Sequence, residues 1–394
     1  MSEKLVFLSA KRTPFGANGG TLRDVNPTDL ALAASQAALA QSGVTAEQID
    51  HVIFGNVLHS APDSIYTPRH TGLRLGVPMS IPALGINRLC GSGFQAIVEA
   101  YHQILAGDTQ IALVGGVENM SMSPYVLRGA RWGLKMGHTQ ATDSMVEALF
   151  DTYAQAPMAI TAENLGAQYK VTREEADEFA LRSQTLCKKA REAGYFREEI
   201  APFAIKDRKG NETKMEHDEH PRPETTRETL AKLKSIFKKD GLVTAGNASG
   251  IVDGAAALVV ASESTAEKLK LKPLGRLVSY GIVGCDPKIM GIGPAPAARE
   301  ALKRAGMTLE QMELIEVNEA FCAQTIAVER ELKLNREILN VNGGATAVGH
   351  PLGASGARIT GHLLHELRRR KKRFGIGSAC IGGGQGIALV IEAF

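Results

Sequence analysis

The chain has 394 residues, of which 44% are hydrophobic and 22% are charged, and its formal net charge at pH 7 is +3. This length and composition predict a large buried core and more than one domain. The small net charge gives no reason to expect nucleic acid or a membrane surface as a partner. No apolar run approaches the length of a membrane span, so stable membrane insertion is not expected. The five cysteines are widely separated and form no CxxC pair, which favours free thiols over disulfides or a zinc site.

Strand-like and helix-like segments alternate from the N-terminus. Residues 4–10 have too short an apolar stretch for a secretory signal and are typical of a first strand, so we expect an intracellular protein. An alanine-rich helix is predicted over 28–41, with short strands over 52–54 and 111–114. This alternation is typical of an α/β fold.

A cysteine among small residues stands where a strand pattern becomes a helix pattern. Residues 83–86 are a short apolar run, residues 94–105 carry apolar side chains at the spacing of one buried helix face, and Gly107 is the predicted stop. Cys90 is therefore placed at a helix N-terminus, where unpaired N–H groups and the helix dipole lower a thiol pKa. These features make Cys90 a candidate nucleophile. The alternative, a cysteine that only packs at the turn, stays open from this motif alone.

The chain repeats one pattern in its two halves. A helix that ends at Gly43 and a helix that ends at Gly306 are each followed by a Thr-x-Glu-Gln turn and a short apolar strand. Cys90 follows Gly43 by 47 positions and His350 follows Gly306 by 44, so His350 is expected at the place that Cys90 occupies in the first copy. Equivalent helix starts across a pseudo-twofold axis would bring Cys90 and His350 into one site.

A segment of different character, about 120–247, lies between the copies. It holds the single tryptophan, a helix predicted over 173–193 and a charge-dense region over 206–240. A structureless loop of this length is rare inside a compact fold, so we expect an inserted lobe that binds substrate. The basic run 368–373 is interpreted as solvent-facing cations at the C-terminal end of a helix.

Four polar stretches stand at predicted strand ends, around Cys90, Asn318, His350 and Cys380. Each stretch alone is a weak signal, because a single cysteine, histidine or asparagine at such a place usually packs or turns the chain. The glycines 382–384 are followed only by a short strand, which leaves no room for the βαβ crossover of a dinucleotide site. Ordered along a duplicated fold, the four stretches together form a candidate catalytic constellation.

Long motifs carry a resemblance to a known family over essentially the whole chain, among them residues 10–16, 349–353 and 377–386. The chain resembles the thiolases, and within them the mitochondrial-type 3-ketoacyl-CoA thiolases. The resemblance implies an α/β fold in which two duplicated core halves form a five-layer αβαβα sandwich with an inserted loop domain. It also implies a homotetramer built as a dimer of dimers.

The resemblance implies boundaries, substrates and a compartment as well. The N-terminal core half is expected over 1–119, completed by 248–272, the CoA-binding loop domain over 120–247, and the C-terminal core half over 273–394. CoA and acyl-CoA are expected as substrates, with no permanently bound cofactor and no metal. The expected compartment is the mitochondrial matrix for a eukaryotic chain and the cytoplasm for a bacterial one.

The catalytic roles are likewise implied by the resemblance. Cys90 attacks the C3 carbonyl of a 3-ketoacyl-CoA, and carbon–carbon cleavage releases acetyl-CoA while the acyl group stays on the sulfur. His350 activates Cys90, and Cys380 protonates the departing carbanion and then deprotonates the incoming CoA thiol. Asn318 positions a water that shares a first oxyanion hole with His350. Backbone N–H groups of Cys90 and Gly382 form the second hole.

For CoA, the family pattern maps onto Arg222, Thr225 and Ser249. The Arg222 guanidinium is suited to a nucleotide phosphate or to stacking on the adenine, while an arginine between prolines is also the pattern of a plain loop charge. Phe237 and Phe321 are placed along the pantetheine tunnel, with core packing as the alternative.

Three functions stay open at this point. Thiolytic cleavage in fatty acid β-oxidation leads, because residues 86–95 and 220–226 resemble the degradative enzymes. The first alternative is an acetoacetyl-CoA thiolase that condenses two acetyl-CoA molecules with the same residues. The second is a non-catalytic acyl-CoA or lipid carrier, which the presence of all four reactive groups disfavours. Cys322 departs from the family pattern and is interpreted as packing, and Cys187 and Cys285 receive no role.

Overall fold

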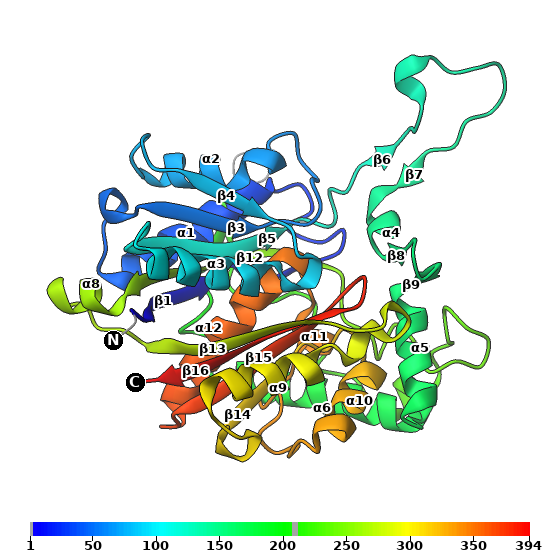
Figure 1. Cartoon of the computed structure of the whole chain (residues 1–394). Helices are drawn as coiled ribbons and strands as arrows, with labels where there is room; N and C mark the ends of the chain where they lie inside the picture. The colour runs from blue at the N-terminus through cyan, green and yellow to red at the C-terminus, as the bar shows by residue number, and fades with distance from the viewer. Residues whose placement is uncertain (1–2, 207–211) are drawn as a thin grey trace.

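The computed structural model describes residues 3–206 and 212–394. In this part of the chain ten strands form one mixed sheet, in the order β14-β15-β16-β13-β1-β12-β5-β3-β4, with β2 paired to the start of β12 (Figure 1). The strands are β1 (Leu5–Arg12), β2 (Gly16–Ala17), β3 (His51–Gly55), β4 (Ala83–Ile86), β5 (Ile111–Glu118), β12 (Val252–Ser262), β13 (Gly275–Gly284), β14 (Leu314–Val317), β15 (Phe374–Ile381) and β16 (Gln385–Ala393).

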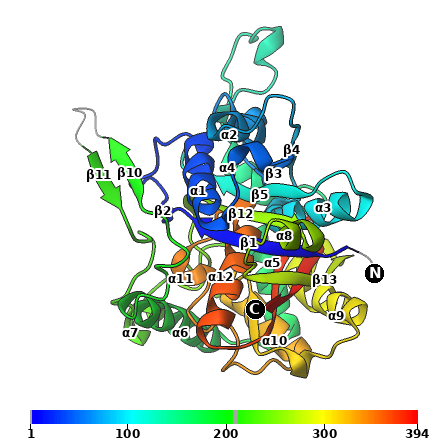
Figure 2. The same cartoon turned by 90° about the vertical axis from the view of Figure 1, so that its left-hand side faces the viewer.

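The sheet consists of two half-sheets that meet at β1 and β13, which pair over only two residue pairs. Strands β1, β12, β5, β3 and β4 form the first half-sheet, and β13, β16, β15 and β14 form the second. Helices α3 (Ser92–Ala106) and α12 (Ser355–Arg369) pack on each other and on both half-sheets (Figure 2). They form the middle layer of the molecule.

The remaining core helices cover the outer faces. Helices α1 (Pro27–Ser42) and α2 (Thr67–Leu75) pack on the first half-sheet, and α9 (Pro294–Ala305) and α10 (Cys322–Leu332) pack on the second. Two short helices are α8 (Glu263–Lys268) and α11 (Ala345–Val348). The layers therefore run helix, sheet, helix, sheet, helix, which confirms the predicted αβαβα architecture (Figure 1).

The strands and helices predicted from the sequence are present. The strands expected over 4–10, 52–54, 83–86 and 111–114 correspond to β1, β3, β4 and β5, and the helix expected over 28–41 corresponds to α1. Helix α1 begins where it does because the Asn26 side chain accepts the N–H of Thr28 at 2.8 Å, with Pro27 as the first helical residue. It ends at Gly43, whose φ of 75° is readily available only to glycine.

In its described residues, the segment between β5 and β12 adds three small two-stranded sheets and four α-helices. They are β6 (Tyr125–Val126), β7 (Thr142–Asp143), α4 (Ser144–Ala148), β8 (Phe150–Asp151), β9 (Ala156–Pro157), α5 (Met158–Gln168), α6 (Arg173–Glu192), β10 (Phe203–Lys206), β11 (Glu212–Met215) and α7 (Arg227–Ala231). The hairpin of β6 and β7 projects far from the core and carries Trp132, which is 88% exposed (Figure 1).

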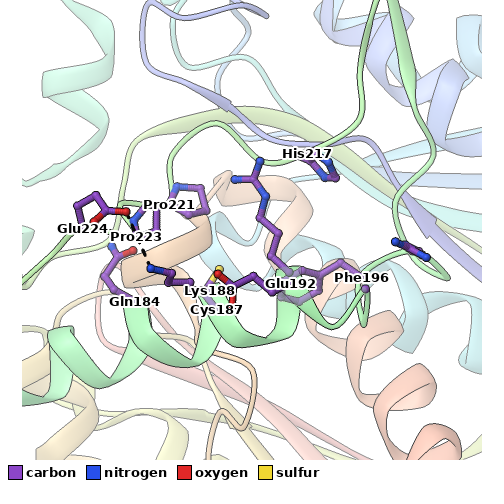
Figure 3. Close-up of a pocket in the computed structure, with 12 residues that line it drawn as sticks. Gln184, Cys187, Lys188, Glu192, Phe196, His217, Pro221, Pro223 and Glu224 are labelled. Atoms are coloured by element: carbon purple, nitrogen blue, oxygen red, sulfur yellow. Dashed lines mark ion pairs between the residues drawn. The ribbon is translucent and has the colours of Figure 1, made fainter.

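Helix α6 matches the helix predicted over 173–193. Its C-terminal half faces the stretch 217–224 across a cavity, shown in Figure 3. Five positions of the charge-dense region over 206–240, residues 207–211, lie outside the described residues. In the part of the chain that the structure describes, no helix is both long enough and apolar enough to cross a membrane.

The basic run 368–373 begins in the last turn of α12, as predicted. Several of its cations also pair with carboxylates. Arg369 and Arg370 contact Glu366, and Lys372 lies 3.2 Å from Glu313. The run therefore caps the helix C-terminus and joins it to neighbouring elements.

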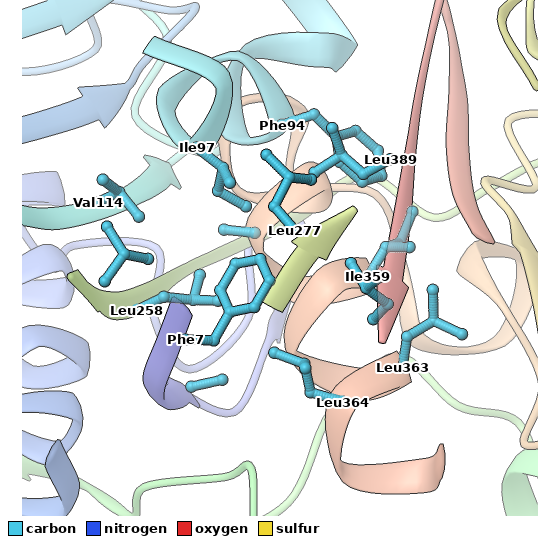
Figure 4. Close-up of a cluster of buried hydrophobic side chains, with 14 of the residues drawn as sticks. Phe7, Phe94, Ile97, Val114, Leu258, Leu277, Ile359, Leu363, Leu364 and Leu389 are labelled. Atoms are coloured by element: carbon cyan, nitrogen blue, oxygen red, sulfur yellow. The ribbon is translucent and has the colours of Figure 1, made fainter. Parts of the chain in front are cut away.

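The main apolar core lies in the middle layer, between the half-sheets (Figure 4). Its members are almost fully buried, and each contributes roughly 1.5–3 kcal/mol through the loss of apolar surface to water. They include Phe7 and Leu258 from the first half-sheet, Leu277 and Leu389 from the second, Phe94 and Ile97 from α3, and Ile359, Leu363 and Leu364 from α12. This core fixes α3 and α12 against each other.

The two central helices approach closely at a pair of glycines near their N-termini. A Cβ atom on Gly93 would lie 2.6 Å from a backbone nitrogen of α12, and one on Gly356 would lie 2.1 Å from a backbone nitrogen of α3. Neither position leaves room for a side chain. The close approach also brings together the 3₁₀ turns that precede the helices, Leu89–Gly91 and Leu352–Ala354.

The predicted repeat is present with a constant offset of 263 positions. The glycines that end α1 and α9 are both left-handed, and the turns after them, Ala46–Gln48 and Leu309–Gln311, both have capping boxes. The same offset relates the turns before α3 and α12, and the first residues of β5 and β15.

One prediction from the repeat is wrong. With the offset of 263, the counterpart of Cys90 is Gly353, and the counterpart of His350 is Asn87. Cys90 lies inside its 3₁₀ turn, whereas His350 lies two residues before the equivalent turn. The two side chains meet because the turns are adjacent, and they do not occupy equivalent positions.

Candidate active site

The turn that carries Cys90 is held by short-range hydrogen bonds. The Ser92 hydroxyl accepts the N–H of Arg88 at 2.8 Å and donates to the carbonyl of Leu89 at 2.7 Å. Leu89 has a φ of 47°, an unfavourable value for a branched side chain. This strained residue directly precedes Cys90, which lines an internal cavity.

Cys90 opens onto a cavity of about 70 Å³ in which most of the predicted catalytic side chains meet. Of the predicted site residues, the cavity is lined by Cys90, His350, Cys380, Gly382, Ser249 and Phe321. The rest of the wall is mainly apolar: Leu89, Ala148, Leu149, Met158, Met290, Ala320 and Leu352. Such a wall excludes water from charges that develop on reacting atoms and strengthens the electrostatic effect of nearby donors. No single motif pointed to these apolar residues, because they come from five separate segments.

His350 follows Gly349, whose φ of 95° turns the chain out of α11. The imidazole is 5% exposed, and its Nδ1 lies 2.5 Å from the Ser355 hydroxyl. Burial, with a further contribution from the positive charge of Arg358, lowers the pKa of His350 to about 3. The imidazole is therefore neutral at rest.

Asn318, on the loop after β14, lies beside His350 as the sequence predicts. Its amide nitrogen is 3.3 Å from Nε2 and 3.4 Å from Nδ1 of the imidazole. An atom almost equidistant from both ring nitrogens lies over the ring and off the lone-pair axis of either nitrogen. The amide oxygen is buried without a hydrogen-bond partner in the protein, so it is free to hold a polar group of a substrate or a water.

The lowered thiol pKa predicted for Cys90 is not found. Burial raises the pKa of Cys90 to about 11, and the negative charge of Glu118 adds to the rise. The N–H groups of Gly382 and of Cys90 itself act in the opposite direction. A helix start contributes only about 0.3–1 kcal/mol, which is less than the cost of burying a thiolate. Cys90 and His350 thus face the cavity as a neutral thiol and a neutral imidazole.

Cys380 lies near the end of β15, opposite Gly386 on β16, and is 1% exposed. Burial raises its pKa well above the usual range of a thiol. The glycines after it form the turn between β15 and β16, as expected from the absence of room for a crossover helix. In this turn Gly382 lines the cavity beside Cys90, and its N–H group lowers the pKa of the Cys90 thiol against the effect of burial. The second cysteine and one proposed oxyanion donor therefore come from one hairpin.

The residues predicted to bind CoA separate into two groups. Ser249 and Phe321 line the cavity, and the N–H of Ser249 donates to the carbonyl of Ala320 at 3.0 Å. Arg222, Thr225 and Phe237 do not line it. Phe237 is 47% exposed, which contradicts core packing as its alternative.

Arg222 is an exposed side chain in a stretch that is tied to the segment before His350. The Gln184 side chain accepts the N–H of Arg222 at 2.8 Å and donates to the carbonyl of Thr346 at 3.1 Å. A ring nitrogen of His220 lies 2.7 Å from the carbonyl of Ala347. Figure 3 shows Gln184 on α6 beside the prolines that flank Arg222, at a second cavity of about 580 Å³.

Sequence reasoning missed a buried carboxylate next to the site. Glu118, at the end of β5, accepts the N–H groups of Leu58 and Gly353, both at 2.8 Å, and the Asn56 amide at 3.0 Å. Burial raises its pKa to about 7. Glu118 thereby joins the loop after β3 to the turn after His350. The sequence signal that could have identified Glu118 is a single acidic residue at the end of an apolar strand.

Cys322 is buried in α10, with its sulfur 3.4 Å from the Thr346 hydroxyl, and it does not line the cavity. Its surroundings agree with the packing interpretation. Among the described residues, no group of three or more His, Cys, Asp or Glu side chains is placed to hold a metal ion.

Two thiols and an imidazole around one largely apolar cavity of a duplicated α/β fold are the groups of an acyltransferase that works through a cysteine thioester. The profile of the thiolase N-terminal domain matches residues 5–264, and that of the thiolase C-terminal domain matches residues 271–393. The chain belongs to the thiolase family.

Relatives match the chain over nearly its full length. The mitochondrial 3-ketoacyl-CoA thiolase of Homo sapiens is 55% identical over 387 residues, which cover 98% of this chain and 97% of the relative. The acetyl-CoA acetyltransferase of Pseudomonas aeruginosa is 47% identical over 390 residues, which cover 99% of each chain. The crystal structure of the human mitochondrial enzyme in complex with CoA superimposes with a TM-score of 0.96 at 53% identity, covering 100% of this chain and 98% of that chain.

Proposed function

We propose that this enzyme cleaves 3-ketoacyl-CoA with CoA, giving acetyl-CoA and an acyl-CoA shortened by two carbons, as in fatty acid β-oxidation. The observation that carries the proposal is the convergence of Cys90, His350 and Cys380 on one cavity, which Gly382 also lines. The identity to a relative named as a 3-ketoacyl-CoA thiolase supports the degradative direction.

In the first half-reaction the Cys90 thiol gives its proton to His350, and the sulfur attacks the C3 carbonyl of the substrate. With a pKa of about 11, the thiol is ionised to only about one part in ten thousand at pH 7, so proton transfer to the imidazole has to accompany the attack. The C2–C3 bond then breaks. The acyl group stays on Cys90 as a thioester, and the electron pair of the bond leaves on the acetyl-CoA enolate.

Cys380 acts as an acid at the end of the first half-reaction and as a base in the second. Its S–H protonates C2 of the enolate, which releases acetyl-CoA. The resulting thiolate takes the proton of an incoming CoA thiol, and the CoA sulfur attacks the thioester on Cys90. Cys90 leaves as a thiolate and recovers its proton from His350. A thiol suits this double role because its pKa is closer to neutrality than that of an alcohol.

Two oxyanion holes complete the proposed machinery. The N–H groups of Cys90 and Gly382 hold the oxygen on C3 while it carries negative charge. His350, together with a water placed by Asn318, holds the thioester oxygen of the departing acetyl-CoA. The unpartnered amide oxygen of Asn318 supports this placement, because a bound water gives it a donor.

We also propose that residues 120–247 form a loop domain for CoA, inserted between core parts 1–119, completed by 248–272, and 273–394. Ser249 and Phe321 then meet the pantetheine near the cavity, with Phe237 further along its path. Arg222 and Thr225 meet the nucleotide at the surface. The exposure of Arg222 and its connection through Gln184 to the segment before His350 support this assignment.

Assembly as a homotetramer is a further part of the proposal. Strand β4 is the edge of the sheet and half exposed, and the projecting hairpin carries Tyr125, Trp132 and Met136 with exposures of 70%, 88% and 105%. A bare sheet edge and exposed apolar side chains are surfaces that a second copy covers.

We also propose a compartment for this enzyme, the mitochondrial matrix or, in a bacterium, the cytoplasm. We propose that it has no permanently bound cofactor.

The test is thiolysis of a ketoacyl series combined with intact-mass analysis. With CoA, 3-ketohexanoyl-CoA is expected to give acetyl-CoA and butyryl-CoA, and incubation with acetyl-CoA alone is expected to leave an acetyl group on Cys90. The variant Cys90→Ala should lose both, whereas Cys322→Ala, which removes a buried thiol outside the cavity, should keep both. If acetoacetyl-CoA were the only ketoacyl-CoA of the series to be cleaved, the result would favour the acetoacetyl-CoA thiolase. A folded protein that binds CoA without any adduct would favour the carrier.

A further inference from the structure

We propose that Ser355 is a positioning residue that holds His350 in the tautomer with its proton on Nδ1, so that the Nε2 lone pair is free for the Cys90 thiol. The inference deepens the proposed function, because it rests on His350 as the base for Cys90. Nothing in the motif around His350 singled out this serine for a role in the reaction.

The contacts of the Ser355 hydroxyl carry the inference. Its oxygen lies 2.5 Å from Nδ1 of His350 and 2.9 Å from the carbonyl oxygen of Pro351, and the residue is fully buried. A hydroxyl has one proton to donate. If the proton goes to the Pro351 carbonyl, the hydroxyl oxygen accepts Nδ1–H, and both contacts are hydrogen bonds. The opposite assignment leaves two oxygens 2.9 Å apart with no proton between them.

The equivalent serine of the first half also combines one donated and one accepted hydrogen bond, although with different partners. Ser92 stands 263 positions before Ser355, and each is the first residue of its central helix. The Ser92 hydroxyl donates to the carbonyl of Leu89 and accepts the N–H of Arg88. The Arg88 N–H is an obligatory donor, so the direction of both bonds is fixed there. The counterpart of Arg88 is Pro351, which has no N–H to donate, so the oxygen of Ser355 is open to accept Nδ1–H of His350 in its place.

The other ring nitrogen is left available by its surroundings. The Asn318 amide lies over the imidazole and does not occupy the Nε2 lone pair, and His350 borders the cavity that Cys90 also lines. A neutral imidazole has one proton, so its position on Nδ1 decides that Nε2 is a base. When the S–H bond of Cys90 breaks, the proton forms a new N–H bond at Nε2. The proton on Nδ1 of His350 stays there throughout, hydrogen-bonded to the Ser355 oxygen.

The first test measures the tautomer without any turnover. In nitrogen-15 spectra of the histidine-labelled enzyme, the imidazole signals that disappear in His350→Asn belong to His350. We expect a protonated Nδ1 and a bare Nε2. A bare Nδ1 with a protonated Nε2 would overturn the proposal, whether or not the enzyme proves to be a thiolase.

The second test compares Ser355→Ala with Thr360→Val, a matched control. Thr360 is buried in the same helix and its hydroxyl donates to the carbonyl of Gly356, four residues back, but Thr360 does not line the cavity. Alkylation of Cys90 by iodoacetamide, followed by peptide mass spectrometry, should slow roughly tenfold to a hundredfold in Ser355→Ala near pH 7. The rates should converge towards pH 11, where the thiolate forms without a base. Thr360→Val should follow the wild type.

The shape of the pH profile separates the proposal from a structural effect. Equal slowing at every pH, or no slowing in Ser355→Ala, would contradict a role through the tautomer. Because alkylation needs no CoA substrate, a failure of the proposed thiolysis shows up separately, as missing product with the alkylation profile intact.

Discussion

The two core halves share one backbone plan and carry unequal chemistry. The first half supplies one reactive side chain, Cys90, whereas the second supplies Asn318, His350 and Cys380. At the first-half positions equivalent to those three stand Gly55, Asn87 and Val117. Duplication therefore explains the frame of the site, and divergence between the copies explains its chemistry.

Small residues of the first half give space to the loops of the second. A Cβ atom on Gly116 would lie 1.9 Å from the carbonyl oxygen of Gly353, in the turn just after His350. The equivalent second-half position, Ala379, carries a methyl group without difficulty. Glu118 then binds the N–H of Gly353 at 2.8 Å. The first half is thus the surface on which the catalytic turn of the second half is seated.

The largest effect is expected from the removal of the Cys380 thiol, which tests whether the second half supplies the acid and base of the reaction. In Cys380→Ala the first-half thiol and its base remain, so acetyl-CoA should still acetylate Cys90. Carbon–carbon turnover should fall by about 10²- to 10⁴-fold, because no group is left to protonate the enolate or to deprotonate CoA. Adduct mass and steady-state thiolysis measure the two effects. Thiolysis at the wild-type rate would remove Cys380 from the mechanism, and Cys322→Ala serves as the control for loss of a buried thiol.

Exchanging the residue types at the equivalent positions 116 and 379 tests how the turn after His350 packs on the first half. Gly116→Ala forces a methyl group into the Gly353 carbonyl, so the free energy of unfolding should fall by about 1–3 kcal/mol or more, and thiolysis should fall as the turn moves. Ala379→Gly should cost only about 1 kcal/mol, because it adds backbone freedom and removes one buried methyl. Urea unfolding measures the change in the free energy of unfolding, and kcat measures the change in thiolysis. Similar losses in the two variants would mean that the halves do not differ in this respect.

The sequence was sufficient for the frame and for the reactive groups, for identifiable reasons. The repeat was visible because its glycine stops and Thr-x-Glu-Gln turns are local signals, and Cys90 and Cys380 stand in long family motifs. The counterpart of Cys90 was misplaced because counting from Gly306 ignored the offset of three positions. That error concerns register alone, and the two side chains still meet.

The features that the sequence did not reveal depend on long-range burial. The rise in the Cys90 pKa comes from desolvation by segments far away in the chain, which no local pattern encodes. Glu118 meets Gly353 across 235 positions. Ser355 is close to His350 in sequence, but the role proposed for it depends on the contacts of its hydroxyl with Nδ1 and with the Pro351 carbonyl, which the sequence does not show.

The smallest expected effect concerns the connection between the stretch around Arg222, which we propose to bind CoA, and the second half. Gln184→Met keeps the length of the side chain and removes its bonds to the Arg222 N–H and the Thr346 carbonyl. Two hydrogen bonds of about 0.5–1.5 kcal/mol each correspond to a KM for CoA raised by roughly 5-fold to 150-fold, with kcat nearly unchanged because the cavity is not altered. Lys188→Met is the matched control one turn further along α6. Its exposed contact with Glu224, at 3.9 Å, should contribute almost nothing. An unchanged KM in Gln184→Met would show that the Arg222 stretch does not set CoA affinity. A change confined to kcat would instead place the effect of Gln184 at His350, through the segment that it shares with Thr346.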